Sequence, residues 1–266
     1  MAAVKDVFAF LDSLAAFETQ MDFDNAGFLV GRGDRQVKRL LVALDITEAV
    51  VEEAGNMGAE LIVSHHPVIF HPAKSITDKD PLGRTLLALI EGGIAAICAH
   101  TNLDAAVGGV NDALATRLGL SDTVVLEPSG TDRLGRPIGI GRAGKAAPGG
   151  PTSASDYAAF VKEALGANGV RYVDAGRPVQ RVAVGGGACG DMGHLVLALG
   201  CDTFVTSDVK YNQFLDARDM GLNLIDAGHY PTENVICPIL ADALRAAFPE
   251  VEVAISKGHK EVFSYR

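Results

Sequence analysis

Leu61-Ile62-Val63-Ser64-His65-His66-Pro67 is an apolar run that ends in two histidines and a proline. A short apolar run of this kind predicts a buried strand that ends at Ser64 and opens into a loop. In open α/β sheets, ligands bind beside the carboxyl ends of the strands. Because successive side chains of extended backbone point in opposite directions, His65 and His66 can each bind a different metal ion. Alternatively, both are loop histidines without a ligand role.

Strand and helix patterns alternate on both sides of this run. Thr47 and Asp80 are suitable N-caps, and Gly58 and Gly93 are suitable helix ends. The alternation predicts an α/β fold with a largely parallel sheet covered on both faces. The elements expected in the first half are a helix over 4–17, a short strand after the acidic turn at 22–27, a strand over 37–46, a helix over 48–57, the strand before His65, a helix over 81–91 and a strand over 94–99 that leads to His100.

A similar alternation returns in the second half, after a stretch rich in Gly and Pro. We expect residues 128–151 to be connecting loops around one short strand over 137–141. The elements expected after it are a helix over 155–165, strands over 170–173 and 179–184, a helix over 191–199, a strand over 203–206, a helix over 209–220, a strand over 222–226, a helix over 231–248 and a strand over 251–255.

The length, composition and net charge of the chain exclude several classes of function. The chain has 266 residues, of which 48% are hydrophobic and 21% charged, so it can bury a large core. Its net charge of −10 argues against sequence-specific nucleic-acid binding and against an anionic membrane surface. The sequence shows no run of about 18 apolar residues and no signal-peptide pattern, so we expect a cytoplasmic protein. The four cysteines lack C-x-x-C spacing, which favours buried thiols over disulfides or a zinc ribbon.

The sequence contains an internal repeat. A shift of 142 residues lays 37–42 on 179–184, and Ser64-His65-His66 then falls on Thr206-Ser207-Asp208. A second shift, of 129 residues, lays His100 on His229 and Asp104 on Glu233. The repeat predicts two similar α/β lobes, 1–128 and 129–266, with a metal site in the cleft between them.

Two histidines other than the pair precede a carboxylate by four residues. These are His100 with Asp104 and His229 with Glu233, each after a predicted strand, and a helical turn would bring imidazole and carboxylate together. Imidazole with carboxylate suits Zn, Mn, Fe or Ni better than Mg or Ca. Glu233 has the longer reach and is the candidate to bridge two ions about 3.5–4 Å apart.

The other interpretation is that His100 and His229 only hydrogen-bond to backbone at the strand ends. The remaining histidines do not follow predicted strands. We expect His71 and His194 on the surface or in loops, and His259 in the C-terminal tail.

Several long motifs resemble those of the Nif-three-like dinuclear-metal-centre proteins, which are often labelled type 2 GTP cyclohydrolase I. The matching stretches are Asp24-Asn25-Ala26-Gly27-Phe28-Leu29-Val30-Gly31, Ser64-His65-His66-Pro67, Ala99-His100-Thr101-Asn102-Leu103-Asp104-Ala105-Ala106, Gly108-Gly109-Val110-Asn111-Asp112, Thr206-Ser207-Asp208-Val209-Lys210-Tyr211 and Asp226-Ala227-Gly228-His229 with Thr232-Glu233. Phe23 departs from a usual Trp, and Ser207 and Asn212 stand where Gly and His are common. These departures leave the candidate ligands unchanged.

The resemblance implies that five residues hold two divalent metal ions per chain: His65, His66, Asp104, His229 and Glu233. It places His100 beside them as a further ligand or as a proton-transfer group. It also implies a ring-shaped homo-hexamer and a small-molecule substrate, with ring opening of the purine of GTP as the activity.

Three hypotheses for function follow. The first is a metal-dependent hydrolase in which a metal-bridged water attacks a nucleotide and His100 transfers a proton. The second is a protein that binds metal or a partner without catalysis. The third rests on 185–190, which satisfies G-x-G-x-x-G with Asp208 at the distance of a ribose-binding acid. That motif alone is weak, because a glycine-rich turn also lets a helix pack closely on a strand.

Overall fold

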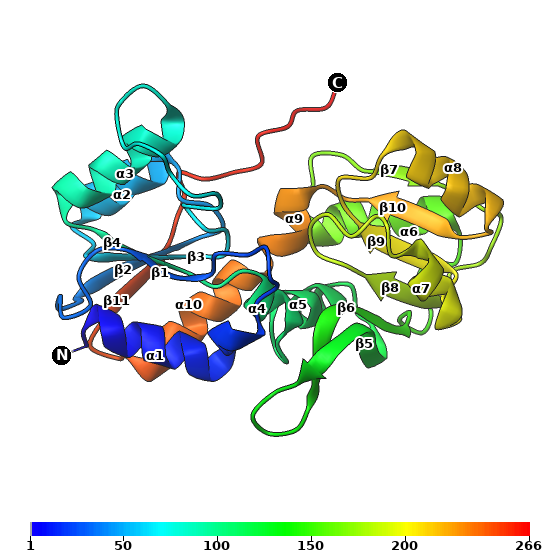
Figure 1. Ribbon diagram of the computed structural model, residues 1–266. Helices are drawn as coiled ribbons and strands as arrows, with labels where there is room; N and C mark the ends of the chain where they lie inside the picture. The colour runs from blue at the N-terminus through cyan, green and yellow to red at the C-terminus, as the bar shows by residue number, and fades with distance from the viewer. Residues whose placement is uncertain (1) are drawn as a thin grey trace. The chain divides into compact units, whose positions relative to one another are not determined.

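The computed structural model describes residues 2–266, which form two compact units (Figure 1). The first unit contains the residues up to Leu103 together with Cys237–Lys260, and the second contains Asp104–Ile236 together with Glu261–Arg266. This grouping differs from the expected lobes 1–128 and 129–266. The reason is that the last strand of the chain joins the sheet of the first unit, where it pairs in parallel with the strand at Arg39–Ala43.

The sheet of the first unit has five strands: β1 (Gly27–Val30), β2 (Arg39–Ala43), β3 (Leu61–Ser64), β4 (Ala95–Cys98) and β11 (Glu252–Ile255). Their order is β1-β4-β3-β2-β11. β1 runs antiparallel to β4, and the other neighbouring pairs are parallel. β3 and β4 are buried along their whole length, as expected for parallel strands covered on both faces.

Helices cover both faces of this sheet. They are α1 (Val4–Leu14), a short 3₁₀ helix (Phe17–Thr19), α2 (Glu48–Met57), α3 (Pro81–Gly92) and α10 (Ile236–Ala247). Figure 1 shows α2 and α3 on one face and α1 and α10 on the other. The predicted caps are confirmed: the side chains of Thr47 and Asp80 accept hydrogen bonds from the first turns of α2 and α3, and Gly58 and Gly93 end them with left-handed backbone.

The second unit has a six-stranded mixed sheet. Its strands are β5 (Ser121–Thr131), β6 (Pro137–Lys145), β7 (Arg171–Val173), β8 (Arg181–Val184), β9 (Thr203–Thr206) and β10 (Asn223–Asp226), in the order β5-β6-β8-β9-β10-β7. The three strands β8, β9 and β10 are parallel, and the outer strands pair antiparallel. The predicted α/β class, with two sheets flanked by helices, is confirmed.

The short strand predicted over 137–141 is confirmed as the first part of β6, which continues to Lys145. The hairpin β5–β6 corrects the rest of the prediction in part, because β5 reaches Thr131, inside the expected loops. The glycines of the hairpin, which suggested loops, lie where the two strands come close together. A Cβ on Gly139 would lie 2.0 Å from the carbonyl oxygen of Glu127, and one on Gly144 would lie 2.7 Å from that of Ser121. Glycine therefore permits pairing at these positions, and the pairing itself is irregular near Pro128.

The helices of the second unit are α4 (Thr101–Ala105), which begins in the first unit, α5 (Val110–Arg117), α6 (Ala154–Leu165), α7 (Gly193–Ala198), α8 (Tyr211–Asp219) and α9 (His229–Glu233). The single helix expected over 231–248 is wrong, because α9 ends at Glu233 and α10 begins at Ile236. Pro238 explains the break, since it cannot donate a hydrogen bond to the carbonyl of Asn234. Over residues 2–266, no helix combines the length and apolarity needed to cross a membrane.

The internal repeat is visible in the pairing of the parallel strands. Leu40 pairs with Leu61 in the first unit, and Val182 pairs with Thr203 in the second, so both partners are shifted by 142 residues. The third strands, β4 and β10, correspond at a shift of 128. This is one less than the expected 129, because the turn before His229 is one residue longer than the turn before His100.

Candidate metal centre

Three histidines of the first unit lie together at the carboxyl ends of neighbouring parallel strands. His65 and His66 follow β3, and His100 follows β4. Their ring centroids are 5.0 Å apart for His65 and His66, 5.2 Å for His65 and His100, and 5.5 Å for His66 and His100. One nitrogen of each ring lies within 4.8 Å of the others. We call these three residues the histidine cluster.

Each ring of the histidine cluster is oriented by an oxygen at its Nδ1. The carbonyl oxygen of Ala99 lies 2.8 Å from Nδ1 of His65. Carboxylate oxygens of Asp45 and Asp24 lie 2.7 and 2.8 Å from Nδ1 of His66 and His100. In this arrangement Nδ1 carries the proton and Nε2 is the nitrogen suited to bind an ion.

Asp24 links the acidic turn before β1 to the start of α4. Its second carboxylate oxygen accepts hydrogen bonds from the backbone N–H and the hydroxyl of Thr101, at 3.0 and 2.5 Å. Burial alone would raise the pKa of Asp24, but the hydrogen bonds from His100 and Thr101 outweigh it and lower the pKa to about 2. Asp24 is therefore ionised at neutral pH and holds His100 in place. In the sequence Asp24 stands only in the acidic turn at 22–27 and in a family-matching stretch, and neither identifies it as the partner of His100.

The second unit holds another group of candidate ligands, which we call the acidic group: Asp104, His229 and Glu233. Nε2 of His229 lies 3.0 Å from a carboxylate oxygen of Glu233, four residues later along α9. Nδ1 of His229 lies 2.6 Å from the carboxylate of Asp208, so this ring too is oriented by an acid. Oxygens of Asp104 and Glu233 lie within 4.8 Å of each other.

The acidic group is suited to a cation. Asp104 and Glu233 are both buried, with 8% and 3% of their surfaces exposed. Two buried carboxylates this close repel each other when both are ionised, and a bound cation would remove that repulsion. Together with imidazole, these donors fit Zn, Mn, Fe or Ni. The chemistry of the donors therefore fits the expected metal.

The glycine-rich turn over 185–190 makes room for Glu233. A Cβ on Gly187 would lie 2.2 Å from Oε1 of Glu233, and one on Gly186 would lie 3.4 Å from its Cγ. The turn is also fixed by its neighbours, because Gly186 donates its N–H to Asn111 and Gly187 donates its N–H to Thr232. The glycines thus have a packing role that needs no dinucleotide.

The family follows from comparison with known proteins. The family model described as Duf34/NIF3 (NGG1p interacting factor 3) matches residues 2–261. The chain belongs to this family. The resemblance inferred from the sequence motifs is thereby confirmed.

Relatives of this NIF3-family chain include proteins named "GTP cyclohydrolase 1 type 2 homolog". The one from Clostridium perfringens is 31% identical over 264 residues, which is 98% of this chain and 99% of the relative. The one from Streptomyces coelicolor is 36% identical over 248 residues, 92% of this chain and 86% of the relative.

Solved structures agree. A Staphylococcus aureus hypothetical protein, 28% identical, matches with a TM-score of 0.91 and 99% coverage of both chains. A Bacillus cereus protein related to NIF3, 24% identical, matches in fold with a TM-score of 0.93 over 100% of this chain and 99% of that one.

Besides Asp24, three further orienting residues were not identified as such from the sequence. Asp45 lies at His66, and Asp208, weighed only as a ribose-binding acid, lies at His229. His259 was expected to be a tail residue, yet only 12% of its side chain is exposed and its Nε2 lies 2.7 Å from Asp45. His71 and His194 are exposed, as expected.

Proposed function

We propose that this NIF3-family chain is a hydrolase that depends on two divalent metal ions per chain. The ligands would be His65 and His66 of the histidine cluster and Asp104, His229 and Glu233 of the acidic group, with Glu233 as the bridge. The observation that carries the proposal is the histidine cluster, in which one nitrogen of each ring lies within 4.8 Å of the others and each Nδ1 has an oxygen partner.

The bound ions would acidify a water molecule and polarise the bond to be hydrolysed. The chain itself supplies orientation and proton transfer. Asp24 and Asp45 fix the rings of His100 and His66, and buried Glu233 supplies negative charge. We assign His100 the transfer of a proton at Nε2, since Nδ1 is held by Asp24.

Metal content tests the ligand assignment. We expect about two ions per chain for the wild type by elemental analysis, and fewer for His65→Ala and Glu233→Ala. His194→Ala is the matched control, because His194 is exposed on α7 and outside both ligand groups. A full metal complement in either ligand variant would show that the assignment is wrong.

One variant distinguishes between proton transfer and metal binding as the role of His100. If His100 transfers a proton, His100→Gln keeps the metal and loses most of its turnover, by about 10²–10⁴-fold. If metal content falls as well, His100 is a ligand.

The substrate proposed is a nucleotide, by analogy with the names of the relatives. Metal-loaded protein should be assayed with GTP, other nucleotides and phosphoesters. Ring opening of GTP, lost in Glu233→Ala, would support the activity. No turnover of any of these by fully loaded protein would favour a non-catalytic metal-binding or partner-binding protein.

We also propose that the protein is cytoplasmic and that it assembles into a homo-hexamer. Light scattering coupled to gel filtration tests its assembly, and a monomer at micromolar concentration would contradict it.

A further inference from the structure

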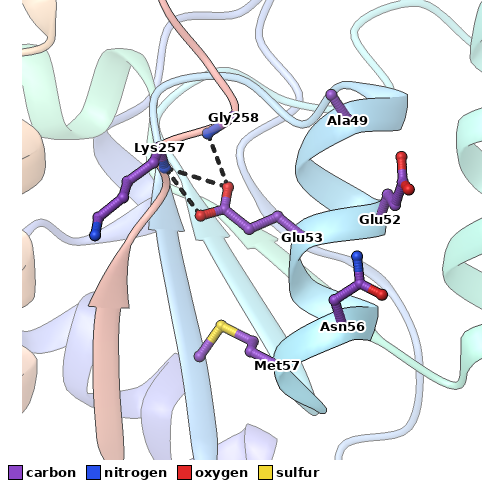
Figure 2. Close-up of a pocket in the computed structure, with 7 residues that line it drawn as sticks. All are labelled: Ala49, Glu52, Glu53, Asn56, Met57, Lys257 and Gly258. Atoms are coloured by element: carbon purple, nitrogen blue, oxygen red, sulfur yellow. Dashed lines mark hydrogen bonds between the residues drawn. The ribbon is translucent and has the colours of Figure 1, made fainter.

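The segment that follows β11 lies against α2 of the same unit. Figure 2 shows Glu53 on α2 with its carboxylate directed at Lys257 and Gly258, in an open hollow also lined by Met57. The carboxylate accepts hydrogen bonds from the backbone N–H groups of Lys257 and Gly258, each at 3.0 Å, and from the hydroxyl of Ser256 at 2.5 Å. We call Ser256–His259 the C-terminal strap.

Glu53 is well suited to hold the strap. Burial raises its pKa, but the hydrogen bonds from Ser256, Lys257 and Gly258 outweigh that effect and lower the pKa below its usual range. A carboxylate that accepts several hydrogen bonds forms a stronger contact than a neutral acceptor would. The backbone N–H of Ser256 also donates to the carbonyl of Val42 on β2, which fixes the start of the strap.

The strap brings His259 to Asp45. Nε2 of His259 lies 2.7 Å from one carboxylate oxygen of Asp45, and Nδ1 of His66 lies 2.7 Å from the other. Asp45 follows β2, His66 follows β3 and the strap follows β11, so three adjacent parallel strands deliver the three side chains to one edge. Asp45 is thus held between two imidazoles.

We propose that the C-terminal strap positions a ligand of the metal centre, with His259 acting through Asp45 on His66. The inference rests on the proposed function, because it names a positioning residue for that site. A carboxylate that contacts a single imidazole can still rotate about its Cβ–Cγ bond. A carboxylate with an imidazole at each oxygen, such as that of Asp45, is held in one orientation. Such a fixed partner sets the orientation and basicity of the ligating ring.

Metal affinity tests the proposal independently of catalysis. We expect His259→Ala to bind Zn²⁺ or Mn²⁺ about 10–100-fold more weakly than wild type in competition with a chelator. The visible spectrum of the Co²⁺-loaded protein should change as well, since the coordination of His66 changes. His259→Gln retains a donor at the position of Nε2 and should recover most of the affinity. His194→Ala, the matched control, should bind as wild type does.

The outcomes distinguish this inference from the proposed function. If wild type binds two ions and His259→Ala binds them equally well, the role of the strap is wrong and the metal centre stands. If wild type binds no metal, the proposed function and the inference both fail. If His259→Ala does not fold, Glu53→Gln is compared with Glu52→Gln, since Glu52 is an exposed neighbour on α2. Weaker binding in Glu53→Gln alone supports the strap, and equal binding overturns it.

Discussion

Gly187 lies so close to the candidate ligand Glu233 that there is no space for a side chain at this position. Its φ of +67° is left-handed, and a Cβ there would lie 2.2 Å from Oε1 of Glu233. We expect Gly187→Ala to displace Glu233 and to lower metal content below that of the wild type. Backbone strain should also lower the free energy of unfolding by about 1–2 kcal/mol. Elemental analysis and a thermal melt measure the two effects.

Gly176 offers a matched control for this change. Its φ is +74°, and a Cβ there would have no atom of a non-adjacent described residue within 4 Å. Gly176→Ala should therefore show similar backbone strain with unchanged metal content. If both variants lose metal equally, the close approach of Gly187 to Glu233 has no role in binding.

The sequence indicates the candidate ligands more readily than the residues that orient them. His65 and His66 stand out because they follow an apolar run directly, and His229 and Glu233 because of their spacing. Asp45 lies 21 residues before His66 and meets it only because β2 and β3 pair in one particular register. Such a partner depends on strand pairing, which local patterns do not specify.

At the scale of elements, we expect the contact of α2 with the C-terminal strap to weaken at acid pH, because it is made by the carboxylate of Glu53. Because the pKa of Glu53 is lower in the folded chain than its usual 4.5, the stabilisation is complete above pH 4.5. It is lost as pH falls through the folded-state pKa. We expect Glu53→Gln to melt below wild type at pH 7, by an amount equivalent to about 1–2 kcal/mol. The difference in melting temperature between Glu53→Gln and wild type should become smaller below pH 4.5.

Thermal melts of both proteins between pH 7 and pH 3 measure this effect. Glu52→Gln should follow the wild type throughout, because Glu52 is exposed. If the difference in melting temperature between wild type and Glu53→Gln widens towards acid pH, the ionised carboxylate of Glu53 does not stabilise the strap.

Elements were predicted well where their causes are local. The bounds of α2 and α3 follow from capping residues and glycines within a few positions. In the hairpin β5–β6 only the strand over 137–141 was expected. The rest depends on pairing between segments that contain turn-forming glycines, so composition indicated loops around that strand. The break before α10 has a local cause in Pro238, and a stricter use of the proline rule would have found it.

At the scale of the whole molecule, the first unit is completed by the end of the chain. β11 pairs with β2, and Leu240 and Leu244 of α10 are 2% and 0% exposed. Burying a leucine contributes about 1.5–3 kcal/mol. The internal repeat could not predict that β11 joins the sheet of the first unit. A repeat shows which segments are similar, but not which sheet a later strand joins.

Two fragments test this organisation. Residues 1–128 lack α10 and β11, which leaves the edge of β2 unpaired and apolar surface uncovered. We expect this fragment to aggregate and to show no cooperative melt. Residues 1–103 joined to 237–260 by a flexible Gly/Ser linker retain all five strands of the sheet, so a cooperative melt and native-like circular dichroism are expected. A cooperative melt of 1–128 with none for the linked fragment would instead favour a lobe boundary near residue 128.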